Sequence, residues 1–250
     1  MASTDTRVAL ITGGAQGLGL AIAERLSRHA RCVLLDMHPE VAEVAASLPG
    51  GAMGLRADVS DEAGIAAAIA RVEQECGRLD ILVNNAGIHP YGSVEDIAQF
   101  DSVSLEDWQR LLQINLTGMF IVTKAALPLM RRGGWGRIVN MSSRTGRTYT
   151  GTASIAYATA KAGVIALTRQ TAGIEGPNGI TANCIAPGSV RTPLTSREGE
   201  EGIARRAART VVGRIGEPSD VAATVAFLAS EDAGYITGAT IDVNGGSSMM

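Results

Sequence analysis

Cysteine is scarce in this 250-residue chain, which holds only Cys32, Cys76 and Cys184. Their wide spacing matches neither a set of metal ligands nor a framework of paired disulfides. A cysteine content of this kind is typical of proteins from a reducing compartment. We therefore expect buried, unpaired thiols and no bound metal.

Long apolar runs and a leader segment are lacking as well. The polar residues 1–7 lead straight into a strand-like run, without the charged and apolar regions of a signal peptide. No apolar stretch reaches the roughly 18 residues that a membrane span needs. These absences predict a cytoplasmic protein that has no membrane as a partner.

Charge is sparse too, since charged residues make up 19% of the chain and the formal net charge is −3. Such a balance provides no basic field for nucleic acid or anionic lipid, so we expect neither as a partner. Hydrophobic residues make up 46% of the chain, which excludes a disordered protein. The length suits one α/β domain with a large core.

Short apolar runs alternate with helical patterns from one end of the chain to the other. Unbroken runs of this kind are typical of strands buried on both faces. The alternation predicts a Rossmann-type doubly wound parallel sheet with helices on both faces, formed by residues 1–250 as a single domain. The runs lie at 8–11, 32–35, 81–83, 138–141, 181–185 and 239–243, and the helical patterns at 18–29, 40–48, 65–76, 105–130, 155–173 and 221–229.

Segment 194–212 is the part of the chain that we expect to be most mobile, because it is rich in Arg and Glu. A charge run of this kind is most often the solvated face of a helix. The other interpretation is a lid over a substrate site.

The first apolar run leads directly into a glycine-rich turn, Thr12-Gly-Gly-Ala-Gln-Gly-Leu-Gly19. Between a strand and a helix, such a turn indicates a dinucleotide site. Gly13, Gly17 and Gly19 let the backbone approach a pyrophosphate, and the following helix offers free N–H groups to it. The alternative is an ordinary glycine-rich turn with no ligand.

Asp36 ends the second apolar run. A carboxylate at this place accepts hydrogen bonds from ribose hydroxyls and repels a 2′-phosphate. Met37 follows it and Gln16 lies in the glycine-rich turn, so neither position has a basic residue that would favour NADP. The sequence therefore predicts NAD as the cofactor. Asp36 can also cap the helix predicted at 40–48, and the two roles are compatible.

Tyr157 and Lys161 lie four residues apart in a predicted helix, so their side chains share one face. An ammonium group within about 4–6 Å favours the phenolate and lowers the tyrosine pKa. A lowered pKa suits acid/base chemistry near neutral pH. The chain has only one other lysine, Lys124, and a rotatable point charge suits a phenolate and a ribose hydroxyl better than a planar guanidinium.

With these motifs the sequence resembles the short-chain dehydrogenase/reductase family, in its single-domain branch. The resemblance covers the chain from Arg7 to Gly246 and implies a Rossmann sheet of about seven parallel strands. It also implies a homotetramer or a dimer. The motifs, in the family's order, are Thr12–Gly19, Asp58, Asn84-Asn85-Ala86-Gly87, Asn115, Ser142-Ser143, Tyr157-x-x-x-Lys161, Asn183, Pro187-Gly188 and Thr192.

By this resemblance Tyr157 is the general acid/base, and Lys161 lowers its pKa and binds the nicotinamide ribose. Ser143 binds the substrate oxygen, and Asn115 holds a water that links Lys161 to solvent. An alcohol gives a hydride to the nicotinamide and its hydroxyl proton to Tyr157, and the reverse direction reduces a ketone. The residues expected to bind NAD are Gly13, Gln16, Gly17, Leu18, Gly19, Asp36, Met37, Asp58, Val59, Asn85, Ala86, Gly87, Tyr157, Lys161, Pro187, Gly188, Val190 and Thr192.

Two departures from the family pattern lie near the expected active site. Ser143 and Tyr157 are one residue further apart than is most common in the family. Ser142 becomes a rival if the loop is aligned differently, but Gly146, at the family's usual offset, favours Ser143. Segment 88–104 is several residues longer than in minimal members, and we expect it at the mouth of the site.

Several side chains are expected to contact the substrate. Arg144 can attract a carboxylate or phosphate; the alternative is a side chain turned to solvent or paired at a subunit contact. His89 suits a polar wall better than a second base. The partly polar surroundings favour a small hydroxylated or oxo compound over a long lipid. The expected substrate residues are His89, Tyr91, Arg144, Tyr149, Thr150, Ser189 and Leu194.

The predicted function is NAD-dependent interconversion of a small secondary alcohol and its ketone. The alternative among enzymes is a ketoreductase similar to the 3-oxoacyl-ACP reductases, which would use NADPH and favour basic residues near positions 16 and 37. The alternative from another class is a non-catalytic dinucleotide sensor. The complete set of Asn115, Ser143, Tyr157 and Lys161 argues against a sensor.

Overall fold

Seven parallel strands form the centre of the molecule, in the order β3-β2-β1-β4-β5-β6-β7. Every neighbouring pair is parallel. The computed structural model describes residues 6–89, 100–151, 153–192, 195 and 199–249. The doubly wound sheet that the strand–helix alternation predicts is confirmed.

The four central strands are buried almost completely, which is why they occur in the sequence as unbroken apolar runs. The edge strands β3 and β7 are mostly half-buried, and glycine and arginine keep β3 from forming an unbroken apolar run. The strands are β1 (Arg7–Thr12), β2 (Ala30–Asp36), β3 (Met53–Arg56), β4 (Ile81–Asn84), β5 (Gly136–Met141), β6 (Ile180–Pro187) and β7 (Thr240–Val243).

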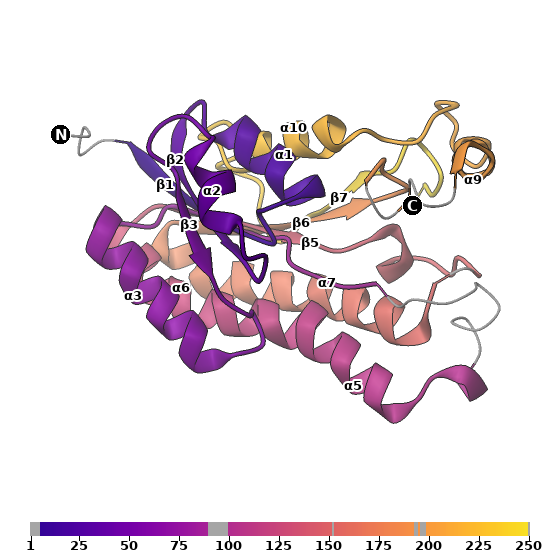
Figure 1. Cartoon of the computed structure of the whole chain (residues 1–250), viewed down its shortest axis with the longest axis horizontal. Coiled ribbons are helices and arrows are strands. Elements are labelled where there is room, and N and C mark those ends of the chain that lie inside the picture. Colours follow the sequence, from indigo (N-terminus) through magenta and orange to yellow (C-terminus); the bar gives the residue numbers. More distant parts are fainter. Residues whose placement is uncertain (1–5, 90–99, 152, 193–194, 196–198, 250) are drawn as a thin grey trace.

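Helices cover both faces of the sheet (Figure 1). On one face lie α1 (Gly17–Leu26), α2 (Val41–Ala46) and α10 (Pro218–Leu228), whose buried side chains share one core cluster. On the other lie α3 (Glu62–Cys76), α6 (Gly118–Gly133) and α7 (Ile155–Glu175). The sheet order reverses between β1 and β4, so a ligand crevice is expected at the carboxyl ends of these strands.

The structure divides the single helix that the sequence predicts at 105–130. α5 (Leu105–Leu112) is followed by a π-helical turn at Gln113–Thr117, and α6 begins at Gly118. The turn contains Asn115, whose side chain is fully buried. Single π-helical turns within longer helices are frequent at functional sites.

The combined stretch Leu105–Gly133 is also long and apolar enough to cross a membrane by length and composition. This finding departs from the expectation that no apolar stretch of the sequence is long enough to span a membrane. The core helix of a soluble protein passes the same test. In this fold α6 packs against α3, β4 and β5, so its apolar face belongs to the core. The cytoplasmic location stays a prediction.

The charged segment 194–212 includes α9 (Gly199–Ala207), at the end of the molecule where the strands finish (Figure 1). Glu200, Glu201 and Arg205 are exposed, as expected for a solvated helix face, while Ile203 is buried. Residues 193–194 and 196–198 lie outside the described part.

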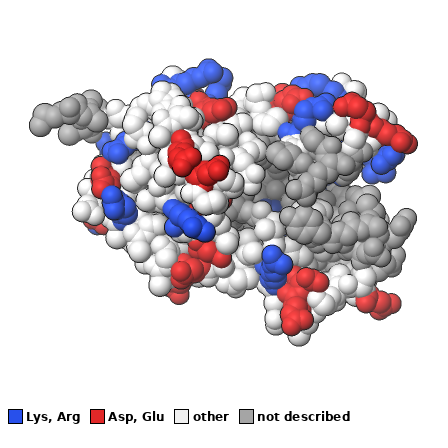
Figure 2. Space-filling model, viewed as in Figure 1, with Lys and Arg blue, Asp and Glu red and all other residues white. Residues whose placement is uncertain are grey.

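Figure 2 shows acidic and basic side chains interspersed over the visible face.

The three thiols are unpaired, as the sequence predicts. Cys32 and Cys184 are buried and Cys76 is half-buried. Burial raises the pKa of Cys32 to about 12, so this thiol stays protonated and unreactive at neutral pH.

Candidate active site

The glycine-rich turn leaves β1 and opens α1 beside the reversal of the sheet. A Cβ atom on Gly19 would lie 2.0 Å from the carbonyl oxygen of Gly13 and 2.7 Å from Asn85 Nδ2. Asn85 Nδ2 itself donates hydrogen bonds to the carbonyl oxygens of Thr12 and Gly13, both at 3.0 Å. Gly17, the first residue of α1, has a φ angle of 55°. The turn therefore presents bare backbone at a helix N-terminus, which suits a pyrophosphate.

Asp36 lies directly beside this turn. Its carboxylate accepts hydrogen bonds from the backbone N–H of Ala15 at 2.9 Å and of His38 at 3.0 Å. A carboxylate has about four lone-pair sites, so both oxygens retain capacity for ribose hydroxyls. The prediction that Asp36 also caps a helix is wrong, because α2 begins at Val41 with Glu40 as its cap residue and no side-chain cap.

Arg56 is a basic residue near Asp36 that the sequence analysis missed. The two residues are paired in the β2–β3 register, and Arg56 Nε donates a hydrogen bond to the carbonyl oxygen of Met37 at 3.2 Å. Met37 itself is 59% exposed, and Gln16 is exposed at the start of α1. The signal that could have found Arg56 is the third strand, but glycine and arginine interrupt its sequence, Met53-Gly-Leu-Arg56, so it is not an unbroken apolar run.

The remaining residues expected around the adenosine line the neighbouring strand ends. Asp58 Oδ1 accepts hydrogen bonds from the backbone N–H and the hydroxyl of Ser60, at 2.8 and 2.7 Å. The backbone N–H of Ala86 donates to Thr12 Oγ1 at 3.0 Å, which ties the end of β4 to the glycine-rich turn. Val59 is buried, and Leu18 packs against the core under α1.

Tyr157 and Lys161 lie one turn apart on α7, with 5.6 Å between Lys161 Nζ and the centre of the Tyr157 ring. Ser143, just after β5, is close enough to Tyr157 for its side chain to lower the tyrosine pKa, and its hydroxyl accepts hydrogen bonds from Thr145. Ser142 turns the other way and donates to the Lys161 carbonyl oxygen at 2.7 Å. A Cβ on Gly146 would lie 2.6 Å from the Lys161 carbonyl carbon, so glycine lets this loop pack on α7. This geometry places Ser143, and not Ser142, beside Tyr157.

The pKa of Tyr157 differs from the expectation. Burial raises it and the Ser143 side chain opposes this rise, whereas the spacing of the two residues on a helix predicts that Lys161 lowers it. Lys161 is only 4% exposed, and burial lowers its own pKa to about 8. Lys161 Nζ donates to the carbonyl oxygen of Met141 at 2.9 Å. Desolvation therefore outweighs attraction between the two side chains.

Asn115 brings a buried acceptor to the same place. Its Nδ2 donates to the carbonyl oxygens of Ile88 and Leu111, at 3.0 and 3.1 Å. Its Oδ1 has no hydrogen-bond partner within the described part of the chain. A Cβ on Gly87 would lie 2.5 Å from this oxygen and 3.5 Å from Lys161 Nζ. An unsatisfied buried oxygen beside a buried ammonium suits a bridging donor such as water.

The segment after β6 forms the opposite side of the site. Gly188, after Pro187 at the end of β6, donates its backbone N–H to Val243 at 3.0 Å. The hydroxyl of Thr195 donates to the carbonyl oxygen of Val190 at 2.8 Å and accepts from the backbone N–H of Thr192 at 2.9 Å. This compact turn holds the residues expected to border the nicotinamide.

The expected substrate residues are only partly brought together. The rings of His89 and Tyr157 are 4.7 Å apart between centres, at an interplanar angle of 55°. Thr150 and Ser189 are half-buried, whereas Tyr149 is 94% exposed. Arg144 is half-buried and its Nη1 lies 3.5 Å from the Ser247 carbonyl oxygen. Tyr91 and Leu194 lie outside the described residues.

No group of three or more His, Cys, Asp or Glu side chains suited to a metal ion occurs among the residues that the structure describes. The site thus consists of a bare glycine turn, one carboxylate at the end of β2, and a group of two half-buried side chains, Ser143 and Tyr157, with the buried Lys161 and Asn115.

Comparisons with known proteins agree with this geometry. The sequence model of the family described as enoyl-(acyl carrier protein) reductase matches residues 13–248. The chain is 41% identical to 2-(S)-hydroxypropyl-CoM dehydrogenase 3 of Xanthobacter autotrophicus, over 96% of this chain and 95% of that protein. It is 39% identical to meso-2,3-butanediol dehydrogenase of Serratia marcescens, over 97% and 95%. The crystal structure of gox2181 superimposes with a TM-score of 0.91 at 33% identity, over 97% of this chain and 96% of that chain.

Proposed function

The chain belongs to the short-chain dehydrogenase/reductase family of oxidoreductases, and on this premise we propose that it interconverts a small secondary alcohol and its ketone with NAD as cofactor. The observation that carries the proposal is the placement of Tyr157 beside Lys161 and Ser143, together with the unsatisfied oxygen of Asn115. Such a group can hold an alcohol oxygen and move its proton.

Ser143 positions the substrate oxygen, and Tyr157 exchanges a proton with it. Because burial raises the pKa of Tyr157, its hydroxyl is protonated at rest and ready to donate to a ketone. In the direction of alcohol oxidation Tyr157 must pass its proton on. Lys161, with a pKa of about 8, and the Asn115 oxygen beside it offer a route to solvent near neutral pH. A nicotinamide dinucleotide supplies the hydride acceptor when it is bound.

NAD is the proposed cofactor because the residues of this site fit its adenosine half. The glycine-rich turn leaves room for a pyrophosphate, and the Asp36 carboxylate is held in place by Ala15 and His38. A fixed negative charge at this place disfavours a 2′-phosphate. Among the described residues, Arg56 lies next to Asp36 and would favour NADP, which makes the cofactor ratio worth measuring.

The relatives support a secondary alcohol as substrate. By their names, one is a dehydrogenase of a 2-hydroxypropyl compound and another of meso-2,3-butanediol. In both names the hydroxyl group is on a secondary carbon.

We also retain the homotetramer as part of the proposal. Phe227 on α10 and Tyr235 before β7 are large apolar side chains exposed at 46% and 104%. Exposed apolar side chains near the last strand suit a subunit contact. Light scattering on the purified protein measures the assembly directly, and a monomer would contradict this part of the proposal.

The test is an absorbance screen at 340 nm with NAD⁺ or NADP⁺ and a panel of secondary alcohols, polyols, hydroxy acids and hydroxysteroids. The Tyr157→Phe protein is the blank, and we expect it to lose about 10³-fold in kcat while it still binds NADH. Enoyl thioesters with NADH are added because of the name of the matching family. Turnover confined to enoyl thioesters, or near-normal activity of Tyr157→Phe, would overturn the proposal.

A further inference from the structure

The hydroxyl of Ser143 is held by a near neighbour in the turn that follows β5. Ser143 Oγ accepts a hydrogen bond from the backbone N–H of Thr145 at 3.2 Å and a second one from Thr145 Oγ1 at 3.0 Å. A serine hydroxyl has two acceptor sites and one donor. Because Thr145 occupies both acceptor sites, Ser143 can enter a further hydrogen bond only as the donor.

The adjacent serine uses its hydrogen differently. Ser142 donates its hydroxyl to the carbonyl oxygen of Lys161 at 2.7 Å, which joins the end of β5 to α7. The Ser143 side chain instead lowers the pKa of Tyr157. A hydrogen bond donated to a phenolate stabilises it and has this effect, whereas an accepted one does not. The direction of the pKa change therefore agrees with Ser143 as a donor.

The turn that carries Thr145 is fixed on two sides. It is a single 3₁₀ turn, and its Gly146 packs on α7, where a Cβ would lie 2.6 Å from the carbonyl carbon of Lys161. On the other side Arg147, the next residue along the chain, forms a half-buried ion pair with Asp242 of β7. Thr145 is therefore held in place by the fold before a substrate binds.

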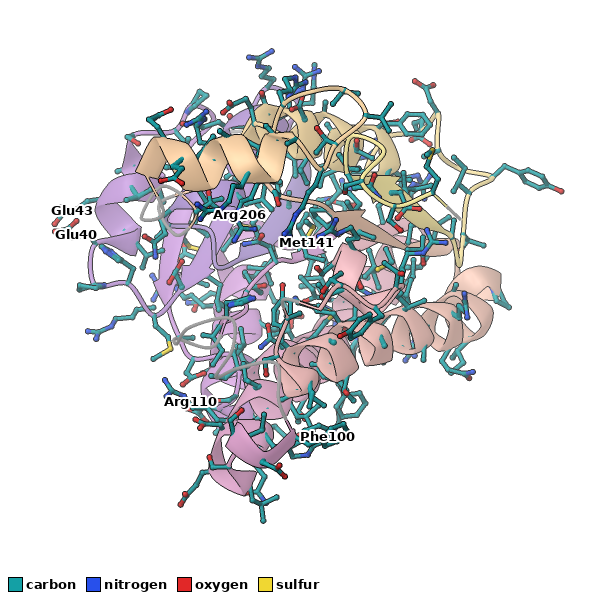
Figure 3. The ribbon with its side chains drawn as sticks, turned by 90° about the vertical axis from the view of Figure 1, so that its right-hand side faces the viewer. Glu40, Glu43, Phe100, Arg110, Met141 and Arg206 are labelled. Atoms are coloured by element: carbon teal, nitrogen blue, oxygen red, sulfur yellow. The ribbon has the colours of Figure 1, made fainter. Side chains whose placement is uncertain are left out.

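The turn lies at the end of the sheet where the proposed chemistry takes place. Figure 3 shows Met141, the last residue of β5, in the middle of this end of the molecule, with Arg206 above it and Arg110 below. Thr145 follows four residues later and is half-buried. Its contact with Ser143 is thus partly shielded from water, and a hydrogen bond is electrostatically stronger in such a place.

We propose that Thr145 is a positioning residue, which holds the Ser143 hydroxyl so that it donates to the oxygen of the substrate. This inference rests on the proposed function. When a ketone is reduced, its carbon gains a hydride while its oxygen gains negative charge and takes the proton of Tyr157. A donor already aimed at this oxygen stabilises the charge. When an alcohol is oxidised, the same donor stabilises the oxygen as its proton leaves for Tyr157.

The experiment compares two substitutions of Thr145. Thr145→Val removes the hydroxyl but keeps the side-chain shape and the backbone N–H, and Thr145→Ser keeps the hydroxyl on a smaller side chain. Thr148→Val is the matched control, because Thr148 is half-buried three residues further along and its backbone N–H bonds to the carbonyl oxygen of Arg144. Ser143→Ala, alone and combined with Thr145→Val, shows whether Thr145 acts through Ser143.

The first measurement is the reduction of butanone and of acetoin with NADH, together with the affinity for NADH by fluorescence. We expect Thr145→Val to lower kcat by about 10-fold while KM and NADH affinity change little, because the lost alignment matters most in the transition state. Thr145→Ser should stay within about 3-fold of the wild type, and Thr148→Val should be unchanged. In the Ser143→Ala protein, Thr145→Val should have no further effect.

The second measurement needs no substrate. With 3-fluorotyrosine in place of tyrosine, ¹⁹F NMR follows the ionisation of residue 157, whose signal is identified by its loss in Tyr157→Phe. Once Ser143 is no longer held as a donor, the phenolate loses a stabilising hydrogen bond. We therefore expect Thr145→Val to move this titration to higher pH, and Thr145→Ser and Thr148→Val to leave it unchanged.

Three outcomes would overturn the inference. The first is that Thr145→Val and Thr148→Val behave alike in both measurements. The second is a rise of kcat in Thr145→Val, which would mean that Ser143 donates to Thr145 and is released by the change. The third is a loss of activity that is equally large in the Ser143→Ala protein, which would show that Thr145 only supports the turn.

The two measurements also separate this inference from the proposed function. If the wild type reduces a ketone but Thr145→Val changes neither kcat nor the titration, the positioning role is overturned while the dehydrogenase assignment stands. If Thr145→Val moves the titration, and does so only when Ser143 is present, but no alcohol or ketone is turned over, the positioning of Ser143 stands and the proposed function fails.

Discussion

The two ends of the candidate active site differ in what they are made of. The cofactor end consists of backbone and one carboxylate, since Gly19 packs on Gly13 and Asp36 is held by Ala15 and His38. The substrate end consists of side chains, with Tyr157 and Lys161 on α7 and Ser143 beside them. The cofactor end recognises its ligand by the shape of the backbone, and the substrate end recognises its ligand by side chains that project from the fold. Substitutions at the cofactor end should therefore reduce ligand affinity far more than substitutions at the substrate end.

The largest effect is expected from Gly19→Ala. The added methyl group would meet the Gly13 carbonyl oxygen at 2.0 Å, and neither atom can move away without displacing the turn. We expect the affinity for NADH to fall by about 100-fold or more, because the N–H groups at the start of α1 lose their alignment. Fluorescence titration with NADH measures it.

Gly173→Ala provides the control for that change. Gly173 is exposed on α7, and a Cβ there would meet nothing within 4 Å. Its replacement should leave NADH affinity unchanged and raise the free energy of unfolding by about 0.4–1 kcal/mol. Equal loss of NADH binding in both variants would show that the cofactor end is not specially sensitive to shape.

Asp36 should produce the next largest effect. We expect Asp36→Asn to raise the ratio of kcat/KM for NADP⁺ over NAD⁺ by about 10- to 100-fold, because the repulsion of a 2′-phosphate is removed. Asparagine retains one acceptor oxygen for Ala15 or His38, so the local backbone is preserved better than by alanine.

Arg56 sharpens this experiment. It lies beside Asp36 in the strand register and offers a guanidinium group to a phosphate once the carboxylate is neutral. Asp36→Asn combined with Arg56→Gln should therefore lose most of the gain for NADP⁺ while NAD⁺ kinetics stay as in the single variant. An unchanged cofactor ratio in Asp36→Asn would contradict the role given to the carboxylate.

The same contrast explains what could be predicted from the sequence. The glycine-rich turn and Asp36 are recognisable because a strand, a turn and a helix follow one another within a short stretch. Tyr157 and Lys161 are recognisable because they share one helical turn. Each of these features depends on local spacing, which a sequence shows directly.

The features that could not be predicted depend on tertiary packing. Arg206 is far from Arg144 in the chain, yet its positive charge helps to lower the pKa of Arg144 in the fold. The π-helical turn around Asn115 has no pattern that distinguishes it from the helices on either side. The rise of the Tyr157 pKa follows from burial, which side-chain spacing does not report. For the same reason, the lowering of the Tyr157 pKa that Lys161 was expected to cause is smaller than the rise caused by burial.

The smallest expected effect concerns the charge of Lys161, at the substrate end. Its pKa is about 8 in the folded protein, against roughly 10.4 in an unfolded chain. Between these values the unfolded chain binds more protons than the folded one, so the free energy of unfolding rises with pH. Below pH 8 both states are protonated, and the penalty for burying the ammonium group is fully present.

The buried cysteines act in the opposite sense and must be separated from Lys161. Burial raises the pKa of Cys32 to about 12 and also raises that of Cys76 and Cys184, so above their unfolded pKa they lower stability as pH increases. The pH dependence of the free energy of unfolding of the wild-type protein alone therefore contains both the increase due to Lys161 and the decrease due to the cysteines. The difference between wild type and Lys161→Met removes the contributions of Cys32 and Cys76, which both proteins share, while Cys184 interacts with Lys161 and titrates together with it.

We expect the free energy of unfolding of the wild type, relative to Lys161→Met, to rise by about 1 kcal/mol between pH 7 and pH 9. Urea titrations at a series of pH values measure this difference. The only other lysine supplies the control, because Lys124 is exposed and paired with an equally exposed Glu62, so Lys124→Met should give a flat difference over the same range. A pH-independent difference for Lys161→Met as well would mean that the Lys161 ammonium group is solvated in the folded wild-type protein. The substrate end would then be as accessible to water at Lys161 on α7 as it is around the exposed Tyr149.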